Sequence, residues 1–138
     1  MADFKKLLVW QKAHALAMST YRMAKGIRRT RDIPWRAQTI RAALSIPTNI
    51  VEGRRQITDK EFARFLRIAL NSACELEYHL MVGRDIGVIK EKEAEAHLRD
   101  VIEVRRMLHG LLNKLAGRPK PPAAVPQNTS MEAETLQS

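Results

Sequence analysis

The sequence predicts an all-α protein folded as an antiparallel, up-down four-helix bundle. Four stretches of the chain place apolar residues at every third or fourth position, which is the period of an amphipathic helix. No stretch alternates apolar and polar residues for long enough to indicate a β-sheet. Short connections join the four stretches, and helices joined in this way pack as antiparallel neighbours.

The first helix is expected at about residues 7–25. Leu7, Trp10, Ala13 and Ala24 keep the helical spacing on one face, and the basic segment that follows Gly26 ends the pattern.

The second helix is expected from Pro34, which suits a first helical position, to Gly53, a natural left-handed stop. The motif "LSIPTNIVEG" places Pro47 inside this helix, and two interpretations compete. A break would make Ile46 the N-cap, although isoleucine has no side-chain acceptor. A continuous, kinked helix loses the hydrogen bond to the carbonyl of Ala43, at about 3 kcal/mol. We favour the kinked helix, in which three nearby side chains could satisfy the freed carbonyl: Ser45, Thr48 and Asn49.

The third helix has the clearest start signal in the chain. Thr58 and Glu61 form a capping box, and Ile57 and Phe62 have the spacing of a hydrophobic staple. The helix is expected to end between residues 83 and 87. Its predicted buried stripe is Phe62, Phe65, Ala69, Ala73, Leu76 and Leu80.

The fourth helix is expected to begin near Lys90, with glutamates in its first turns, where the helix dipole favours negative charge. Lys114 and Gly117 close it. The residues predicted to face inward are Leu98, Val101, Ile102, Leu108, Leu112 and Leu115.

These elements give one domain over residues 1–117. Residues 118–138 are rich in proline and then polar, so we expect a disordered C-terminal tail. No apolar run approaches the roughly 20 residues that span a bilayer, and no signal peptide is recognisable. Cys74 is the only cysteine, so an intramolecular disulfide is excluded. We expect a cytoplasmic protein with no membrane partner.

The formal charge is +9, and residues 1–67 hold 15 of the 24 basic residues but only 5 of the 15 acidic ones. Such asymmetry often marks a surface for RNA or DNA, although a solubilising surface remains the alternative. The bundle topology predicts two patches, one in the first loop and the start of helix two, the other where helix two ends. The candidate nucleic-acid-binding residues are Arg28, Arg29, Arg31, Arg36, Arg41, Arg54 and Arg55.

No residue cluster indicates catalysis, a metal site or a cofactor. The histidines lack the Glu-x-x-His motif that builds metal sites in bundles. Glu75 with His79, and Glu93 with His97, have the spacing of ordinary contacts on a helix surface. We therefore expect a protein that is not an enzyme.

The second helix is apolar over more than one face. Such a helix indicates burial against both its own bundle and a second subunit, so we expect a homo-oligomer. The candidate oligomer interface is Ile40, Leu44, Pro47 and Val51.

Two polar residues near the proline have alternative roles. Asn49 could satisfy loose backbone groups, and Glu52 could pair with Arg41, with Arg55 or with an arginine of another chain. Direct contact of either residue with a ligand is the alternative.

The patterns "VWQKAHALA", "RAALSIPTNIVEG" and "SACELE" resemble the four-helix-bundle proteins encoded in intervening sequences of bacterial 23S ribosomal RNA genes. The accessory variability proteins of diversity-generating retroelements share this fold. The resemblance covers about residues 5 to 115, and its structural motif residues are Trp10, Ser45, Pro47, Asn49, Glu52 and Gly53. It implies rings of five subunits, and for the retroelement relatives a basic surface that engages a reverse transcriptase and nucleic acid. At Thr39, Ile40 and Asn71 the chain departs from the family pattern.

The sequence thus favours a non-catalytic homo-oligomeric scaffold, with a pentamer preferred, whose arginine patches meet RNA, DNA or an acidic protein. The alternative is a purely protein-binding assembly module, with a reverse transcriptase or another protein as partner.

Overall fold

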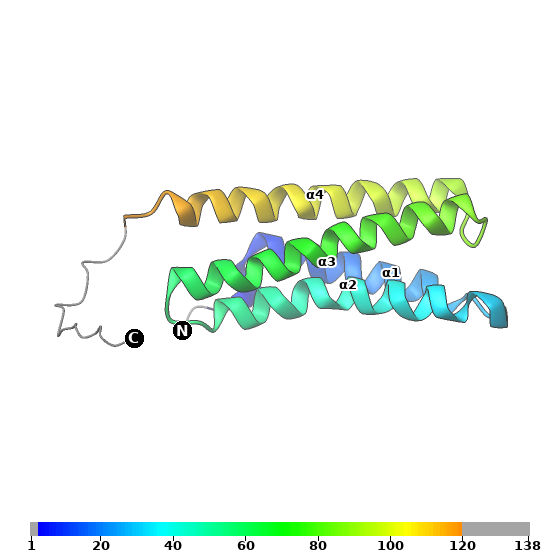
Figure 1. The fold of residues 1–138 in the computed structure, drawn as a ribbon, viewed down its shortest axis with the longest axis horizontal. Coiled ribbons are helices and arrows are strands. Elements are labelled where there is room, and N and C mark those ends of the chain that lie inside the picture. The colour runs from blue at the N-terminus through cyan, green and yellow to red at the C-terminus, as the bar shows by residue number, and fades with distance from the viewer. Residues whose placement is uncertain (1–2, 120–138) are drawn as a thin grey trace, which may run out of the picture.

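The structure, a computed structural model, describes residues 3–119 and confirms the four-helix, up-down bundle within that range. The long helices lie side by side and alternate in direction (Figure 1). From residue 120 onward, the predicted tail lies outside the described residues. The elements are η1 (Phe4–Lys6), α1 (Leu8–Lys25), η2 (Thr30–Asp32), α2 (Ile33–Arg54), α3 (Asp59–Asp85) and α4 (Glu91–Ala116).

One apolar core runs along the bundle and receives residues from every long helix. Its largest fully buried side chains include Leu16 from α1, Ile46 and Ile50 from α2, Leu76 from α3 and Leu108 from α4. The helical spacing predicts this arrangement correctly, with local shifts. Leu66 is buried where Phe65 was expected, and Phe65 is only half-buried. Of the predicted inward residues of α4, Leu98, Ile102 and Leu112 are half-buried against the core.

α2 is continuous through Pro47, so the prediction of a single helix is confirmed and the broken alternative is wrong. Two side chains close to the proline bond to the backbone one turn earlier. The Thr48 hydroxyl donates to the carbonyl of Leu44 at 2.7 Å, and Asn49 Nδ2 donates to the carbonyl of Ser45 at 2.8 Å. Neither bond reaches the freed carbonyl of Ala43, which the sequence suggested as their acceptor.

Gly53 does not end α2 as a left-handed stop. The helix continues to Arg54, and Gly87 is the only glycine with positive φ in the described chain. Gly53 is instead buried against α3. A Cβ at Gly53 would lie 2.9 Å from Cδ1 of Phe62 and 2.9 Å from Cβ of Phe65. The glycine therefore admits two aromatic residues of α3.

Of the two hydrogen bonds of the capping box predicted at the start of α3, the structure contains the one from the backbone to the threonine. The backbone N–H of Glu61 donates to Oγ1 of Thr58 at 3.1 Å. The hydrophobic staple is wrong, because Ile57 is fully exposed while Phe62 is buried. The α2–α3 turn points the isoleucine into solvent, and spacing alone does not reveal that direction.

Trp35 and Gly83 repeat the aromatic-on-glycine contact at the other end of the α2–α3 pair, with the partners exchanged. Here the glycine belongs to α3, and a Cβ on it would lie 2.8 Å from Cε2 of Trp35. The indole N–H also donates to the carbonyl of His79 at 2.8 Å. The two helices are thus anchored at both ends of their contact.

The α1–α2 and α3–α4 loops lie at the same end of the bundle, opposite the α2–α3 loop (Figure 1). This placement decides which arginines can act together.

Candidate nucleic-acid interface

The α1–α2 loop presents the densest basic cluster. Arg28, Arg29 and Arg31 are all exposed. Within the described chain, neither Arg28 nor Arg29 has a carboxylate within 4.0 Å, and Arg31 has only its neighbour Asp32 at that limit. Residues 22–36 as a whole hold six basic side chains and one acidic one. Guanidinium groups free of ion pairs can contact phosphates without first breaking an internal contact.

Arg36 differs from the other three because it serves the loop itself. Its side chain is half-buried, and Nη1 donates to the carbonyl of Ile27 at 2.8 Å. This bond fixes the loop against the first turn of α2. Arg36 therefore positions the basic cluster.

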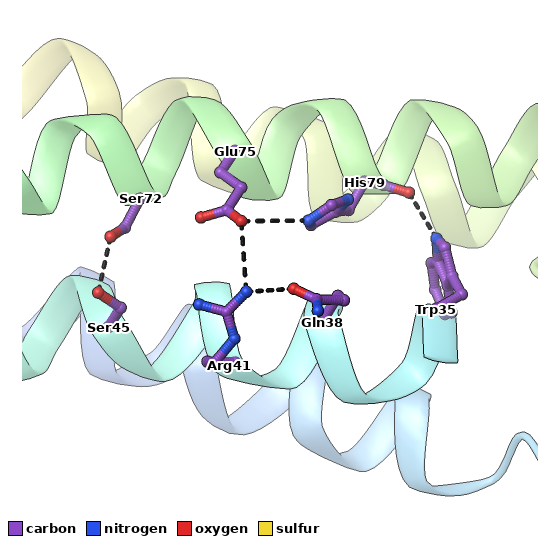
Figure 2. A network of polar contacts seen from close by, with 7 residues as sticks. All are labelled: Trp35, Gln38, Arg41, Ser45, Ser72, Glu75 and His79. Atoms are coloured by element: carbon purple, nitrogen blue, oxygen red, sulfur yellow. Dashed lines mark hydrogen bonds and ion pairs between the residues drawn. The ribbon is translucent and has the colours of Figure 1, made fainter. Parts of the chain in front are cut away.

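Arg41 belongs to a row of polar contacts between α2 and α3 that Figure 2 shows. Its guanidinium bonds to Gln38 and lies 3.7 Å from Oε2 of Glu75, which is 3.5 Å from Nε2 of His79. The prediction that Glu52 pairs with Arg41 within the chain is therefore wrong. Arg41 remains exposed and already has a carboxylate nearby, so it is less available to phosphate than Arg28.

Ser45 continues the same row. Its Oγ lies 2.7 Å from Oγ of Ser72 on α3 and accepts a hydrogen bond from Asn49 Nδ2 at 3.1 Å (Figure 2 shows the serine pair). Asn49 thus bonds within α2 to Ser45, and not to the carbonyl freed by Pro47 as the sequence suggested. Glu52 has no ion pair among the described residues, and its carbonyl accepts a bond from Gln56 at 2.9 Å.

The second predicted patch, Arg54 and Arg55, lies at the opposite end of the bundle. The guanidinium of Arg54 lies 5.7 Å from the Phe62 ring centroid, and its buried Nε has no hydrogen-bond partner in the described residues. Arg55 is exposed. The structure therefore places the candidate arginines at the two ends of the bundle, apart from Arg41, which lies between them on α2, and the loop set is the larger.

Between the two loops at the basic end lies a hollow of about 540 Å³. The sequence did not predict it, because its walls come from segments far apart in the chain. The first loop contributes residues 26–29, 31 and 32, and the second contributes Ile86, Gly87 and Val88.

The four candidate interface residues on α2 have different environments. Pro47 is buried within the chain itself, so its side chain is already covered. Ile40 and Val51 are half-buried, and Leu44 is 39% exposed. The apolar stripe that remains open to a partner therefore consists of Ile40, Leu44 and Val51.

Trp10, the motif residue of α1, packs against the core and fixes the N-terminal segment. Its ring makes an edge contact with Phe4, with centroids 5.0 Å apart, and stacks on His14 at 4.9 Å.

The two histidine pairs predicted in α3 and α4 make contacts only within their own helices. Glu75 reaches His79, whereas His97 bonds to the backbone carbonyl of Glu93.

Neither a metal cluster nor a membrane span was found in the described part of the chain. No group of three or more His, Cys, Asp or Glu side chains there could hold a metal ion. No helix within residues 3–119 is both long and apolar enough to cross a bilayer.

The fold and its basic end define a class of protein, a four-helix up-down bundle with an arginine-rich loop. Residues 5–110 match the 23S rRNA-intervening sequence protein family, and the chain belongs to this family. The resemblance suggested by the sequence motifs is thereby confirmed.

A solved structure supports the fold independently. It is a protein of unknown function from the S23 ribosomal protein family of Bacteroides thetaiotaomicron, similar to this chain with 24% sequence identity and a TM-score of 0.73. The similarity covers 76% of this chain and 98% of that one. No curated protein sequence matches the chain.

Proposed function

We propose that the protein is a non-catalytic homo-oligomeric scaffold, a pentamer, that binds RNA or DNA through the arginines of its α1–α2 loop. One observation carries the binding proposal: Arg28 and Arg29 are exposed and have no carboxylate partner among the described residues, and Arg31 lies beside them. Lysine and arginine contacts to phosphates release counterions and provide sequence-independent affinity. An oligomer would repeat the cluster, so that weak contacts add up on one strand.

The exposed stripe of α2 supports the oligomer. Leu44 is 39% exposed between the half-buried Ile40 and Val51, so the outer side of α2 offers apolar surface that a second copy would remove from water. A closed ring requires each subunit to present this surface to a different surface on its neighbour.

Fluorescence anisotropy with a labelled RNA and a labelled duplex DNA tests the binding. We expect binding at low ionic strength that weakens steeply between about 50 and 200 mM salt, because several phosphate contacts are lost together. Absence of salt-dependent binding to either probe would overturn the nucleic-acid part. Light scattering tests the assembly, for which the expected mass is five times that of the chain, and a monomer at micromolar concentration would overturn it.

A second candidate is a purely protein-binding module, and exposed apolar side chains on α3 favour it. Tyr78 is 63% exposed and Met81 is 38% exposed. A partner bound there, such as a reverse transcriptase or another protein, would hold through apolar contact and resist added salt. Salt sensitivity therefore separates the two functions.

A further inference from the structure

The hollow at the basic end combines two kinds of wall. One wall is the α1–α2 loop, which contributes Arg28, Arg29 and Arg31. The other is the α3–α4 loop, which contributes Ile86, Gly87 and Val88. The hollow of about 540 Å³ lies within the usual range of small-ligand pockets, roughly 300–1,000 Å³.

Hydrogen bonds within the first loop and between the loops and the helices hold both walls in place. On the first wall, Arg36 bonds to the carbonyl of Ile27 at 2.8 Å, and the Asp32 N–H bonds to the carbonyl of Arg29 at 2.9 Å. On the second, the Val88 N–H bonds to the carbonyl of Gly83 at 2.8 Å. The hollow is thus formed before any ligand enters, which reduces the entropy lost on binding.

The second wall exposes an apolar side chain. Ile86 is 61% exposed, although the burial of such a side chain is normally favourable. Gly87 has φ of +79°, and no atom lies within 4 Å of the position where its Cβ would be. A flat ring can therefore approach the backbone here, beside the exposed isoleucine.

The first wall favours phosphate. Guanidinium groups present paired N–H donors that match phosphate oxygens, and these bonds are stronger than bonds between neutral groups. The lining contains three arginines and one acidic residue, Asp32, whose carboxylate lies 4.0 Å from Nε of Arg31. The hollow therefore carries a net positive charge. A ligand that satisfies both walls carries a phosphate and, close to it, a flat ring whose face can pack on an apolar side chain.

The geometry points to the terminal nucleotide of a single-stranded RNA or DNA as the ligand of this hollow, with its 5′-phosphate on the arginines and its base against Ile86 and Gly87. The inference rests on the proposed nucleic-acid binding and makes it specific. Inside a duplex the bases are stacked and paired, so base faces are available only in loops, bulges and ends. Of these, only a 5′-phosphorylated end carries a phosphate with a second negative charge, which suits three neighbouring arginines.

The experiment compares short single-stranded RNAs with a 3′ fluorescent label by anisotropy. One has a 5′-phosphate, and its control has a 5′-hydroxyl and one extra nucleotide, so both carry the same number of phosphates. We expect the phosphorylated RNA to bind about tenfold tighter to the intact full-length protein, as for a charge-assisted hydrogen-bond pair. Equal affinity with normal salt dependence would overturn the inference and leave the proposed function intact. Absence of binding to both RNAs would overturn both.

Variants locate the preference. Ile86→Ser should reduce this preference several-fold, whereas Ile57→Ser, at an even more exposed isoleucine in the α2–α3 loop, should leave it unchanged. Arg28→Gln with Arg29→Gln should abolish it, and Arg99→Gln with Arg106→Gln on the exposed side of α4 should not. An Ile86→Ser protein that keeps the full preference for the 5′-phosphate would overturn the claim that the base packs against the apolar wall.

Competition with adenosine monophosphate and with inorganic phosphate tests whether the hollow prefers the end of a strand to a free nucleotide or a free phosphate. We expect the nucleotide to displace the phosphorylated RNA at higher concentration than unlabelled RNA does, and inorganic phosphate to be weaker still. If the nucleotide alone binds as tightly as the RNA, the strand contributes nothing and the assignment to a strand end is wrong.

Discussion

The indole ring of Trp35 lies directly over Gly83, so that the aromatic side chain of α2 occupies the space that a side chain of α3 would fill. The same ring donates a hydrogen bond to the carbonyl of His79, one turn before the glycine. The indole is therefore held in position by both a polar and an apolar contact.

This contact predicts that Gly83→Ala destabilises the protein. A new Cβ would overlap the ring of Trp35, which is a bulky group tied to the backbone of His79. We expect a loss of about 1–3 kcal/mol in the free energy of unfolding, as for overpacked cores. Urea denaturation followed by circular dichroism measures this loss.

Gly110→Ala is the matched control for that substitution. Gly110 also lies inside a long helix, α4, but no atom is within 4 Å of its Cβ position. Alanine there should raise stability by up to about 1 kcal/mol, because it is the better helix former. If both alanine variants behave alike, the close packing at Trp35 is not the cause.

The serine pair between α2 and α3 gives a second prediction. Ser45 and Ser72 are 2.7 Å apart at a partly buried position, so removal of either hydroxyl leaves the other without this partner. We expect Ser45→Ala or Ser72→Ala alone to cost about 1 kcal/mol. The double variant should cost less than the two singles together, and a double-mutant cycle measures that coupling. Additive losses would show that the hydroxyls do not stabilise each other.

Thr58 gives a third prediction at the start of α3. Its hydroxyl accepts the N–H of Glu61, so Thr58→Ala should lower the free energy of unfolding by about 1 kcal/mol. Thr58→Ser keeps the acceptor and serves as the control. Thermal denaturation of both proteins distinguishes loss of the cap from a general effect of substitution.

Leu44 gives a fourth prediction, on assembly. Leu44→Gln should shift the mass measured by light scattering toward the monomer, because a polar side chain on the α2 stripe loses part of the apolar area that a second copy would bury. Met81→Gln on α3 is the control, since Met81 is 38% exposed and Leu44 is 39% exposed. A mass that falls equally in both variants would spread the interface over both helices, and a mass that falls in neither would place it elsewhere.

Local signals in the sequence predicted local structure well. The Thr58 cap and the passage of α2 through Pro47 depend on residues within a few positions of each other, so spacing was enough to predict both. The left-handed stop predicted at Gly53 is wrong for the opposite reason. Its function is to admit Phe62 and Phe65, and only the packed fold reveals that approach.

In the candidate site too, the sequence predicts the features that depend on neighbouring residues and misses those that depend on packing. The sequence identified the arginines of the α1–α2 loop as a cluster, since they are neighbours in the chain. It could not identify Arg36 as a support for the loop, nor place Ile86 opposite the cluster, because both depend on how the loops and helices are arranged in space. Arg41 was grouped with the free arginines although Glu75 lies across the helix pair from it.

The exchanged aromatic and glycine partners at the two ends of the α2–α3 pair have an evolutionary consequence. A larger residue at 83 requires a smaller one at 35, and a larger residue at 53 requires a smaller one at 62 or 65. Related chains should therefore change these positions in pairs, so that sequence comparison across the family would show them covarying while their neighbours drift independently.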